Sequence, residues 1–226
     1  MSQPKRRGTA DDERTALTRR SVAGAAVALA DAEGLAAVTI RRLAKDLGVT
    51  PMALYWHFRN KDELMDGIVE LLYEEIDVPA VQPSAPWPRQ LRTLLESIVA
   101  VLRAHPATAP LLATRNVTSE SSLRTIETAL DILGRAGFTP AEATQIVRHA
   151  LSTVTNLVSG LPGATGRLAD PRSARNFLES LPAGTYPRLV EAAGPLSACE
   201  DQDAYLAFGL ELLLAGIEAT ARTRSQ

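Results

Sequence analysis

The chain of 226 residues has a single cysteine, Cys199, and no run of 18 apolar residues that lacks a charge or a proline. One thiol cannot form an intrachain disulfide, which favours a reducing compartment such as the cytoplasm. A membrane-spanning helix needs roughly 18 or more apolar residues, so no transmembrane segment is predicted. The amino end is polar and mixed in charge and does not have the pattern of a secretory signal.

Residues that commonly carry catalysis are also scarce. The three histidines, His57, His105 and His149, do not share the i, i+4 spacing of a metal-binding helix, and none lies beside the cysteine. The sequence contains no GxSxG element, phosphate-binding loop or dinucleotide fingerprint, and the glycines at 160–163 are typical of a turn. We therefore expect no enzyme, no metal site and no cofactor.

Aromatic residues make up only 4% of the chain, whereas the apolar fraction is 46% and is dominated by Ala and Leu. Both residues have high helix propensity, and no alternating β pattern interrupts the chain, so the predicted fold is all-α. A proline-rich connector is expected over 78–88, and irregular chain over 161–172 and 184–195. Helices are expected at 18–33, 39–47, 50–58, 60–76, 87–103, 106–114, 120–136, 140–159, 170–181 and 203–223.

The charges are divided unevenly along the chain. Residues 1–61 hold 11 Lys and Arg against 6 Asp and Glu, whereas the remainder holds 13 against 20. A basic first quarter on an acidic body indicates that only one end of the molecule meets phosphates. Ordinary surface scatter is the alternative.

The segment 39–58, TIRRLAKDLGVTPMALYWHF, predicts two short helices joined by a tight turn. Thr39 and Thr50 are good N-cap residues, and Pro51 stands at the first helical position, where its missing amide costs nothing. Gly48 stands where a left-handed residue is needed to end the first helix. The expected inward-facing residues are Ile40, Leu43, Ala44, Leu47, Leu54 and Phe58.

The second of these helices carries side chains that the core does not need. We expect Trp56 to pack in part, whereas Thr50, Met52, Ala53, Tyr55 and His57 remain free to face a partner. A short helix with exposed aromatic residues at this position of a helix-turn-helix suits the major groove of DNA.

The segment 47–64, LGVTPMALYWHFRNKDEL, resembles the DNA-binding domain of the tetracycline-repressor (TetR) family. The resemblance extends over residues 18–222, and Trp87, Ala113–Arg115, Gly137–Phe138 and Phe208–Leu212 are similar to the founding repressor's subgroup. It implies a flexible arm over 1–15, whose basic triplet either stays solvated or touches DNA. It further implies a three-helix DNA-binding domain over 16–62, and a larger helical domain over 63–226 for ligand binding and dimerisation.

The resemblance also assigns roles in a complex with a double-stranded DNA operator. Phosphate contacts hold the protein in register and carry no sequence information. Met52 and Ala53 offer apolar contact suited to a thymine methyl group, and Pro51 replaces a long polar base reader of the founding repressor. The operator must therefore differ from that repressor's. The implied phosphate contacts are Tyr55, Lys61, Thr39 and Arg41, and the base-reading face is Thr50, Pro51, Met52 and Ala53, with His57 nearby.

Residues 203–223 are too apolar for a helix with one exposed face. The helix could be buried within its own domain, and part of it must be; the resemblance implies that it also pairs with helix 140–159 and their copies in a second subunit. A two-fold dimer would place two reading helices about 34–36 Å apart on a palindromic operator. The expected stripe is Leu206, Gly209, Leu210, Leu213, Gly216, Ile217 and Thr220.

The implied ligand site departs from that of the founding repressor, which grips its drug with polar side chains and a histidine-bound magnesium. Asp77, Leu94, Leu111 and Ala129 stand where polar drug contacts are expected, and the metal ligand is absent. Each lost hydrogen-bond partner would cost about 1–3 kcal/mol. We therefore expect a small, more apolar effector that is not magnesium-tetracycline.

The expected apolar lining of the ligand site is Leu94, Ile98, Leu111, Leu112, Ala129, Leu130 and Val147. The expected polar anchors are Thr114, Arg115, His149 and Asn156, and Asp77 could meet a cationic ligand. His149 could instead be a core or interface histidine. The resemblance implies that ligand binding shifts helix 60–76 and moves the reading helices out of register. A ligand-binding protein that uses the helix-turn-helix for protein contacts is the rival interpretation.

Overall fold

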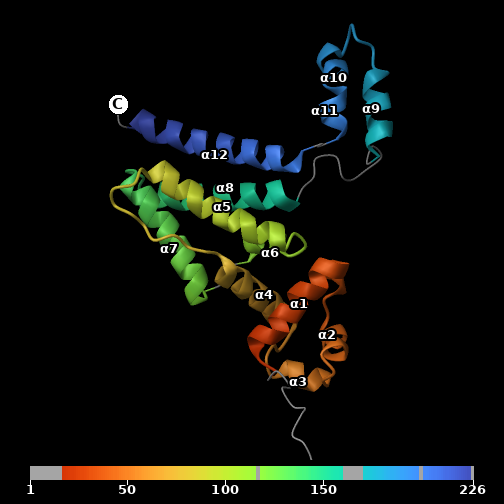
Figure 1. The fold of residues 1–226 in the computed structure, drawn as a ribbon, viewed down its shortest axis with the longest axis vertical. Helices are drawn as coiled ribbons and strands as arrows, with labels where there is room; N and C mark the ends of the chain where they lie inside the picture. The colour runs from red at the N-terminus through yellow and green to blue at the C-terminus, as the bar shows by residue number, and fades with distance from the viewer. Residues whose placement is uncertain (1–16, 116–117, 160–169, 199–200, 225–226) are drawn as a thin grey trace, which may run out of the picture.

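A computed structural model describes residues 17–115, 118–159, 170–198 and 201–224, and within these ranges every regular element is a helix (Figure 1). A small group of helices stands at one end, and a larger layered body stands at the other. The predicted arm over 1–15 and Cys199 lie outside the described residues. The elements are α1 (Arg19–Glu33), a 3-10 turn (Leu35–Ala37), α2 (Ile40–Asp46), α3 (Pro51–Tyr55), α4 (Lys61–Glu75), α5 (Trp87–Ala104), α6 (Ala109–Thr114), α7 (Glu120–Arg135), α8 (Pro140–Ser159), α9 (Pro171–Glu179), α10 (Pro187–Glu191), α11 (Ala193–Ser197) and α12 (Gln202–Arg224).

The small end is shaped by its caps, as the sequence predicts. The hydroxyl of Thr39 accepts from the Arg42 amide, and the hydroxyl of Thr50 accepts from the Ala53 amide, which satisfies donors at the start of α2 and α3. Gly48 has a φ of 65°, so it reverses the chain between the two helices. The motif therefore has the predicted helix-turn-helix geometry.

Helix α4 carries the small end on the body, because it packs against α1 on one side and against α5, α6 and α7 on the other. Asn60 caps its first turn, and its buried side chains include Leu64, Ile68, Leu71, Leu72 and, at its end, Ile76. Phe58, which is fully buried at the end of the motif, lies directly against Gly67 in the middle of this helix. A side chain at position 67 would occupy the place of the Phe58 ring.

We expect Gly67→Ala to destabilise the protein by about 1–3 kcal/mol, although alanine is the better helix former. Its Cβ would stand 2.5 Å from Cε1 and 2.7 Å from Cζ of Phe58. In the matched control Gly24→Ala, the nearest atom is Cδ2 of Leu71 at 4.0 Å, and we expect a gain of about 0.4–1 kcal/mol. Urea unfolding at equal protein concentration would measure both, and an equal gain in the two variants would contradict the packing argument.

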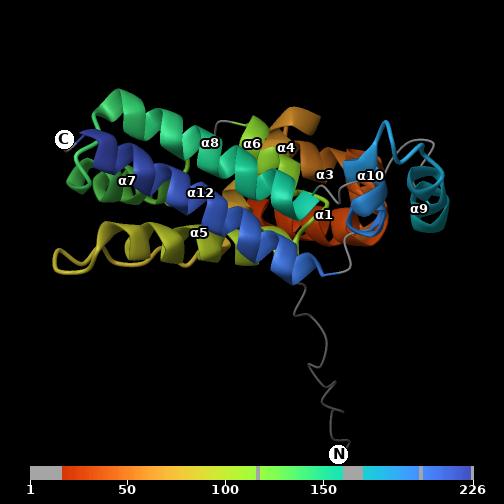
Figure 2. The same ribbon diagram turned by 90° about the horizontal axis from the view of Figure 1, so that it is seen from above.

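The body is layered, with α8 and α12 side by side over α5 and α7 (Figure 2). Helix α8 begins with reciprocal hydrogen bonds, in which the Thr139 amide donates to Glu142 at 2.9 Å and the Glu142 amide donates to the Thr139 hydroxyl at 3.4 Å. The rings of Phe138 and Trp87 pack perpendicular to each other, with their centroids 6.2 Å apart, which joins the start of α5 to the α7–α8 turn.

The predicted stripe on the last helix is mostly an internal one. Leu206, Leu210 and Ile217 are buried together with Leu214, and Gly209 lies against the side chain of Leu157 in α8. Gly216 and Thr220, which belong to the same predicted stripe, are exposed. Most of the stripe is therefore packed within its own chain, which was one of the two interpretations that the sequence allowed.

Helix α12 is nevertheless long and apolar enough to cross a membrane by length and composition, with a mean hydropathy of 1.4 over Gln202–Thr223. Two of its charged groups make ion pairs with α5, Glu211 with Arg92 and Asp203 with Arg103. These contacts hold one side of α12 against its own chain, whereas only 22% of this segment is buried and Phe208 and Leu212 on the other side are exposed.

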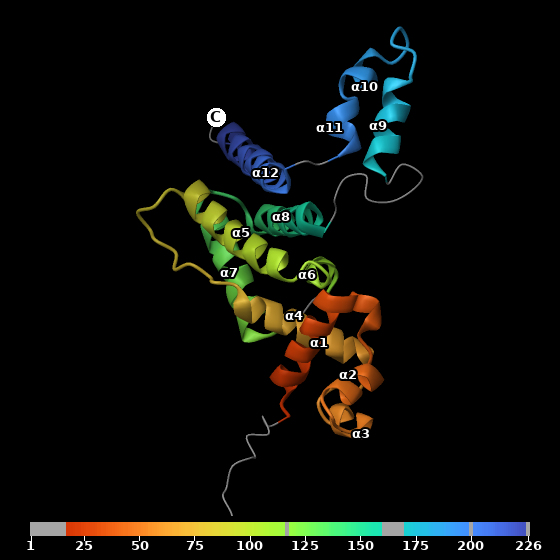
Figure 3. The ribbon, with the colours of Figure 1, turned by 45° about the vertical axis from the view of Figure 1, so that its right-hand side comes forward.

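The expectation of irregular chain over 184–195 is wrong. Two short helices, α10 and α11, begin there, and with α9 they form a small unit that stands away from the body (Figure 3). Pro187 stands in the first turn of α10, where proline is tolerated because that amide needs no partner. Helix α9 lies within the predicted range 170–181, and Asp170 caps it by accepting from the Ser173 amide.

Candidate nucleic-acid interface and ligand cavity

Helix α3 presents an uncovered row of large side chains at the end of the small domain. Met52 is 67% exposed and Trp56 is 85% exposed. The predicted phosphate contact Tyr55 and the predicted base-reading residues Thr50 and Pro51 are exposed as well. The expectation that Trp56 packs in part is wrong, because the helix ends at Tyr55 and turns the indole outward. Ala53 and the ring of His57 are half-buried.

Four cations around this row make no ion pair with another described residue. Two of them, Arg41 and Lys61, are exposed and were predicted as phosphate contacts. The other two, Lys45 and Arg59, are also exposed but were not predicted. The helical spacing of Lys45 from Arg41 on α2 was the available signal. Unpaired cations around an exposed reading helix can neutralise phosphates without breaking internal contacts.

Arg42, by contrast, is committed to the fold. Its guanidinium donates to both oxygens of Glu33 in α1, at 2.6 and 2.8 Å, and to both oxygens of Asp46 in α2, at 2.8 and 3.0 Å. These hydrogen bonds raise the pKa of Arg42 and lower the pKa of Glu33. The pairing of Arg42 joins α2 to α1. Of the two adjacent arginines, Arg41 is therefore the one that is exposed and has no ion pair with a described residue.

Arg19 has a similar role at the end of α3. Its Nη1 donates to the His57 carbonyl oxygen at 3.0 Å, and its guanidinium lies 4.4 Å from the centre of the Phe58 ring. Its Nε pairs with Glu70 of α4 at 3.4 Å. The segment that follows Tyr55 is therefore held to both α1 and α4.

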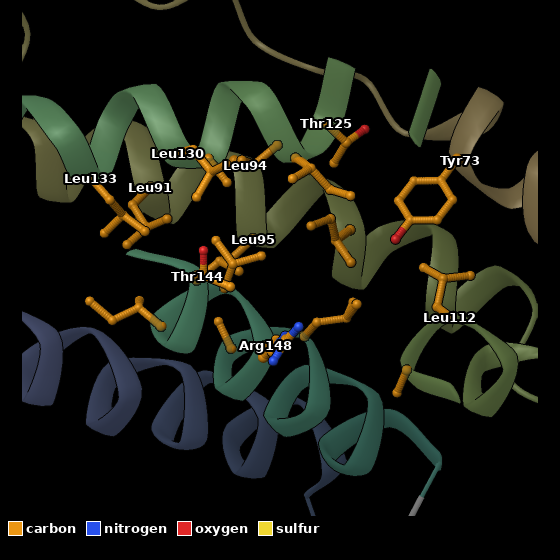
Figure 4. A pocket seen from close by; sticks show the side chains of 18 of the residues that line it. Tyr73, Leu91, Leu94, Leu95, Leu112, Thr125, Leu130, Leu133, Thr144 and Arg148 are labelled. Carbon is orange, nitrogen blue, oxygen red and sulfur yellow. The ribbon is translucent and has the colours of Figure 1, made fainter. Parts of the chain in front are cut away.

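The body contains a partly open cavity of about 590 Å³, which lies within the common range for small-molecule sites (Figure 4). Its walls come from α4, α5, α6, α7 and α8 and are mostly apolar. Of the predicted ligand-site residues, those that line it are Leu94, Ile98, Leu112, Arg115, Ala129, Leu130 and Val147.

The other predicted ligand residues do not line this cavity. Leu111 is buried in the core, and Thr114 is exposed, with its hydroxyl donating to the Pro110 carbonyl. Asp77 is exposed beyond the end of α4, as a solvated helix end would be. His149 and Asn156 lie on the exposed side of α8, so the structure does not bring these predicted polar anchors to the cavity. The mixed Ala, Val and Thr composition of α8 left its rotation undetermined by the sequence.

Four polar side chains at the cavity were not predicted, and they are Tyr73, Thr125, Thr144 and Arg148. Tyr73, on α4, is 6% exposed and directs its hydroxyl toward the cavity, and burial raises the pKa of this hydroxyl (Figure 4). Arg148, on α8, lies at the cavity beside Val147. The sequence signal for Tyr73 was its position beside the apolar residues Leu71 and Leu72 of α4. A tyrosine buried at such a position needs a polar group or open space near its hydroxyl.

Arg115 lines the cavity and also contacts the first turns of α4, next to the DNA-binding domain. Its Nη2 pairs with Asp62 at 2.8 Å, and its Nη1 pairs with Asp66 at 2.6 Å and donates to the Asp62 carbonyl at 3.1 Å. Hydrogen bonds to these two carboxylates raise the pKa of Arg115. Asp62 stands one residue after Lys61, so one side chain joins the ligand cavity to the first turn of α4.

A second junction lies at the other end of α4. Nδ1 of His105, at the end of α5, stands 2.7 Å from Asp31 of α1, and its Nε2 stands 3.0 Å from Glu75 of α4. Burial by itself would lower the pKa of His105, but the hydrogen bonds to the two carboxylates outweigh it and the pKa is raised. The protonated ring donates to both carboxylates and holds three helices together.

We expect His105→Gln to lower the free energy of unfolding by about 1–3 kcal/mol below pH 6, where two charge-assisted hydrogen bonds are lost. A folded pKa above the unfolded value gives stability that is complete below the unfolded pKa and is lost as the pH rises through the folded one. The difference between variant and wild type should therefore shrink toward high pH. Urea unfolding between pH 5.5 and 8.5 would measure it, and His57→Gln, whose ring makes no hydrogen bond with a described residue, is the control. A difference that grows with pH would refute the assignment.

The chain matches known families over both of its parts. Residues 24–68 match the family described as bacterial regulatory proteins, tetR family, and residues 79–221 match the tetracyclin repressor-like, C-terminal domain. The second match alone covers more than half of the chain.

Individual relatives agree with this assignment. An HTH-type transcriptional regulator of Saccharopolyspora erythraea is 32% identical over 211 residues, which cover 91% of this chain and 86% of that protein. The class D tetracycline repressor of Escherichia coli is 32% identical over 208 residues, which cover 89% of each. The structure of the Streptomyces coelicolor TetR family protein ActR in complex with actinorhodin matches with a TM-score of 0.77 and 30% identity, covering 91% of this chain and 98% of that one. This chain is therefore a member of the tetracycline-repressor (TetR) family of transcriptional regulators.

Proposed function

We propose that the protein is a cytoplasmic repressor that binds a palindromic operator as a homodimer and is released when a small, largely apolar molecule enters the cavity. The observation that carries the proposal is the exposed α3, with Tyr55 and four cations around it that make no ion pair with a described residue, in the same chain as a cavity that reaches α4 through Arg115. Two such α3 helices in a dimer would enter successive major grooves on one face of the duplex.

A gel-shift titration on DNA from upstream of the protein's own gene, repeated at several salt concentrations, tests the proposal. We expect the affinity to fall steeply with salt, because each neutralised phosphate contributes a slope of about −0.9 to log K against log salt. Lys61→Gln removes one such contact from each subunit, so the slope should become shallower by about 2.

The control for Lys61→Gln is Arg124→Gln, which removes a charge from α7 that pairs with Glu120 far from α3. It should leave both the affinity and the slope unchanged. Binding with no salt dependence, or an equal effect of both substitutions, would favour the rival interpretation in which the helix-turn-helix contacts a protein.

We propose further that the effector is not magnesium-tetracycline. Leu94 and Ala129 line the cavity where polar drug contacts would be needed, and its walls include no histidine. No group of three or more His, Cys, Asp and Glu side chains suited to a metal ion occurs within the described residues. A clear rise in melting temperature with the magnesium-bound drug would overturn this part of the proposal.

A further inference from the structure

The polar side chains that line the cavity are all hydrogen-bond donors, and some of them already have partners within the protein. Among the described residues that line it, none carries a carboxylate, an amide side chain or an imidazole. We propose that the ligand is an apolar molecule with one acidic group, bound by the guanidinium of Arg148 and by the hydroxyl of Tyr73. This rests on the proposed function, because it names the class of ligand for the same cavity.

Arg148 is the cation that a ligand could neutralise. It makes no hydrogen bond or ion pair with any residue of the described ranges, and it lies on the α8 side of the cavity (Figure 4). The other arginine in the wall, Arg115, is already paired with Asp62 and Asp66. Because Arg148 remains exposed, an acidic group bound there would sit at the open side of the cavity while the rest of the ligand lies among the leucines.

Tyr73, on α4, supplies the second donor at the cavity. The side chain is 6% exposed, and its hydroxyl points into the open space of the cavity without a hydrogen bond to a described residue (Figure 4). Burial raises its pKa, so the hydroxyl keeps its proton at neutral pH and acts as a donor. An oxygen of an acidic ligand is the acceptor that this geometry lacks.

The two threonines that line the cavity do not offer a free donor, because each hydroxyl already donates within its own helix. The hydroxyl of Thr125 donates to the Ser121 carbonyl at 2.9 Å, and that of Thr144 donates to the Pro140 carbonyl at 2.8 Å. A cationic ligand would meet Arg148 and Arg115 without any carboxylate among the lining residues to balance its charge. Asp77, the residue that the sequence offered to a cation, is exposed elsewhere.

The experiment compares two fluorescent probes with the same aromatic skeleton. 1-Anilinonaphthalene-8-sulfonate carries an acidic group, and N-phenyl-1-naphthylamine lacks it. Both are titrated into the intact protein and into Arg148→Gln, Tyr73→Phe and the control Arg124→Gln, and mutual displacement establishes that they share one site. We expect Arg148→Gln to weaken the sulfonate about tenfold, Tyr73→Phe about threefold, and neither to change the neutral probe more than about twofold. Arg124→Gln should change neither probe.

The possible outcomes separate the inference from the function on which it rests. If the neutral probe binds and the sulfonate binds equally well with and without Arg148, the acidic-ligand inference is overturned and the apolar cavity remains. The same holds if Arg148→Gln changes the subunit association in sedimentation but not the affinity for the sulfonate, since Arg148 then serves the dimer. If neither probe binds the wild-type protein, the cavity itself does not accept an aromatic ligand, and the proposed effector site falls as well.

Discussion

The double variant Phe208→Glu, Leu212→Glu is expected to be monomeric and to bind the operator about 100- to 10,000-fold more weakly, because linked half-sites contribute about this much. Phe208 is 65% exposed and Leu212 is 59% exposed, and their spacing of four places both on the outward side of α12. The inward side of the helix is already buried against its own chain through Leu210 and Leu214. Four carboxylates introduced into a two-fold interface would repel one another and lose their hydration.

Sedimentation velocity and operator titration at matched salt would measure both effects. Leu123→Glu is the control, because Leu123 is an exposed leucine on α7 and should leave the dimer intact. Gly216→Leu offers a second approach, since a Cβ at this position has no atom of its own chain within 4 Å. If the double variant remains a dimer with full operator affinity, α12 is not the dimer helix.

The features that the sequence predicted well are those decided by a few neighbouring residues. Caps such as Thr39 and Thr50, the positive φ of Gly48 and the proline at the start of α3 act within one helical turn, so the pattern was sufficient. Inward placement of Leu54 and Phe58 followed from their spacing. The exposure of Trp56 was missed because it depends on where α3 ends, and helix ends are difficult to place from sequence.

The cavity was predicted less well, because its lining depends on how five helices are rotated against one another. Positions in strongly amphipathic α5 and α7, such as Leu94 and Ala129, were placed at the wall. His149 and Asn156 were chosen for their polarity, yet the structure puts them on the exposed side of α8 and leaves Arg148 at the wall. Polarity alone thus selected the wrong members of α8, since one step along a helix changes direction by about 100°.

Arg115 provides the sharpest test of how the two parts communicate. A compound that raises the melting temperature of the wild-type protein should also lower its operator affinity, by about 5- to 150-fold for a typical coupling between sites. In Arg115→Met we expect the same compound to lower operator affinity less than about threefold, since the guanidinium that joins the cavity wall to Asp62 and Asp66 is absent. Operator titration with and without the compound would measure this ratio in each protein.

Asp66→Asn removes the other end of the same contact and should reduce the ratio in a similar way, while the double variant should show little further loss, because two groups of one network are not additive. Both carboxylates are partly solvated, so the loss of Arg115 leaves no buried unpaired charge and the variants should fold. A full response in Arg115→Met would show that the signal reaches α4 by another route, for which the buried contacts of Tyr73 within α4 itself would be the next place to look.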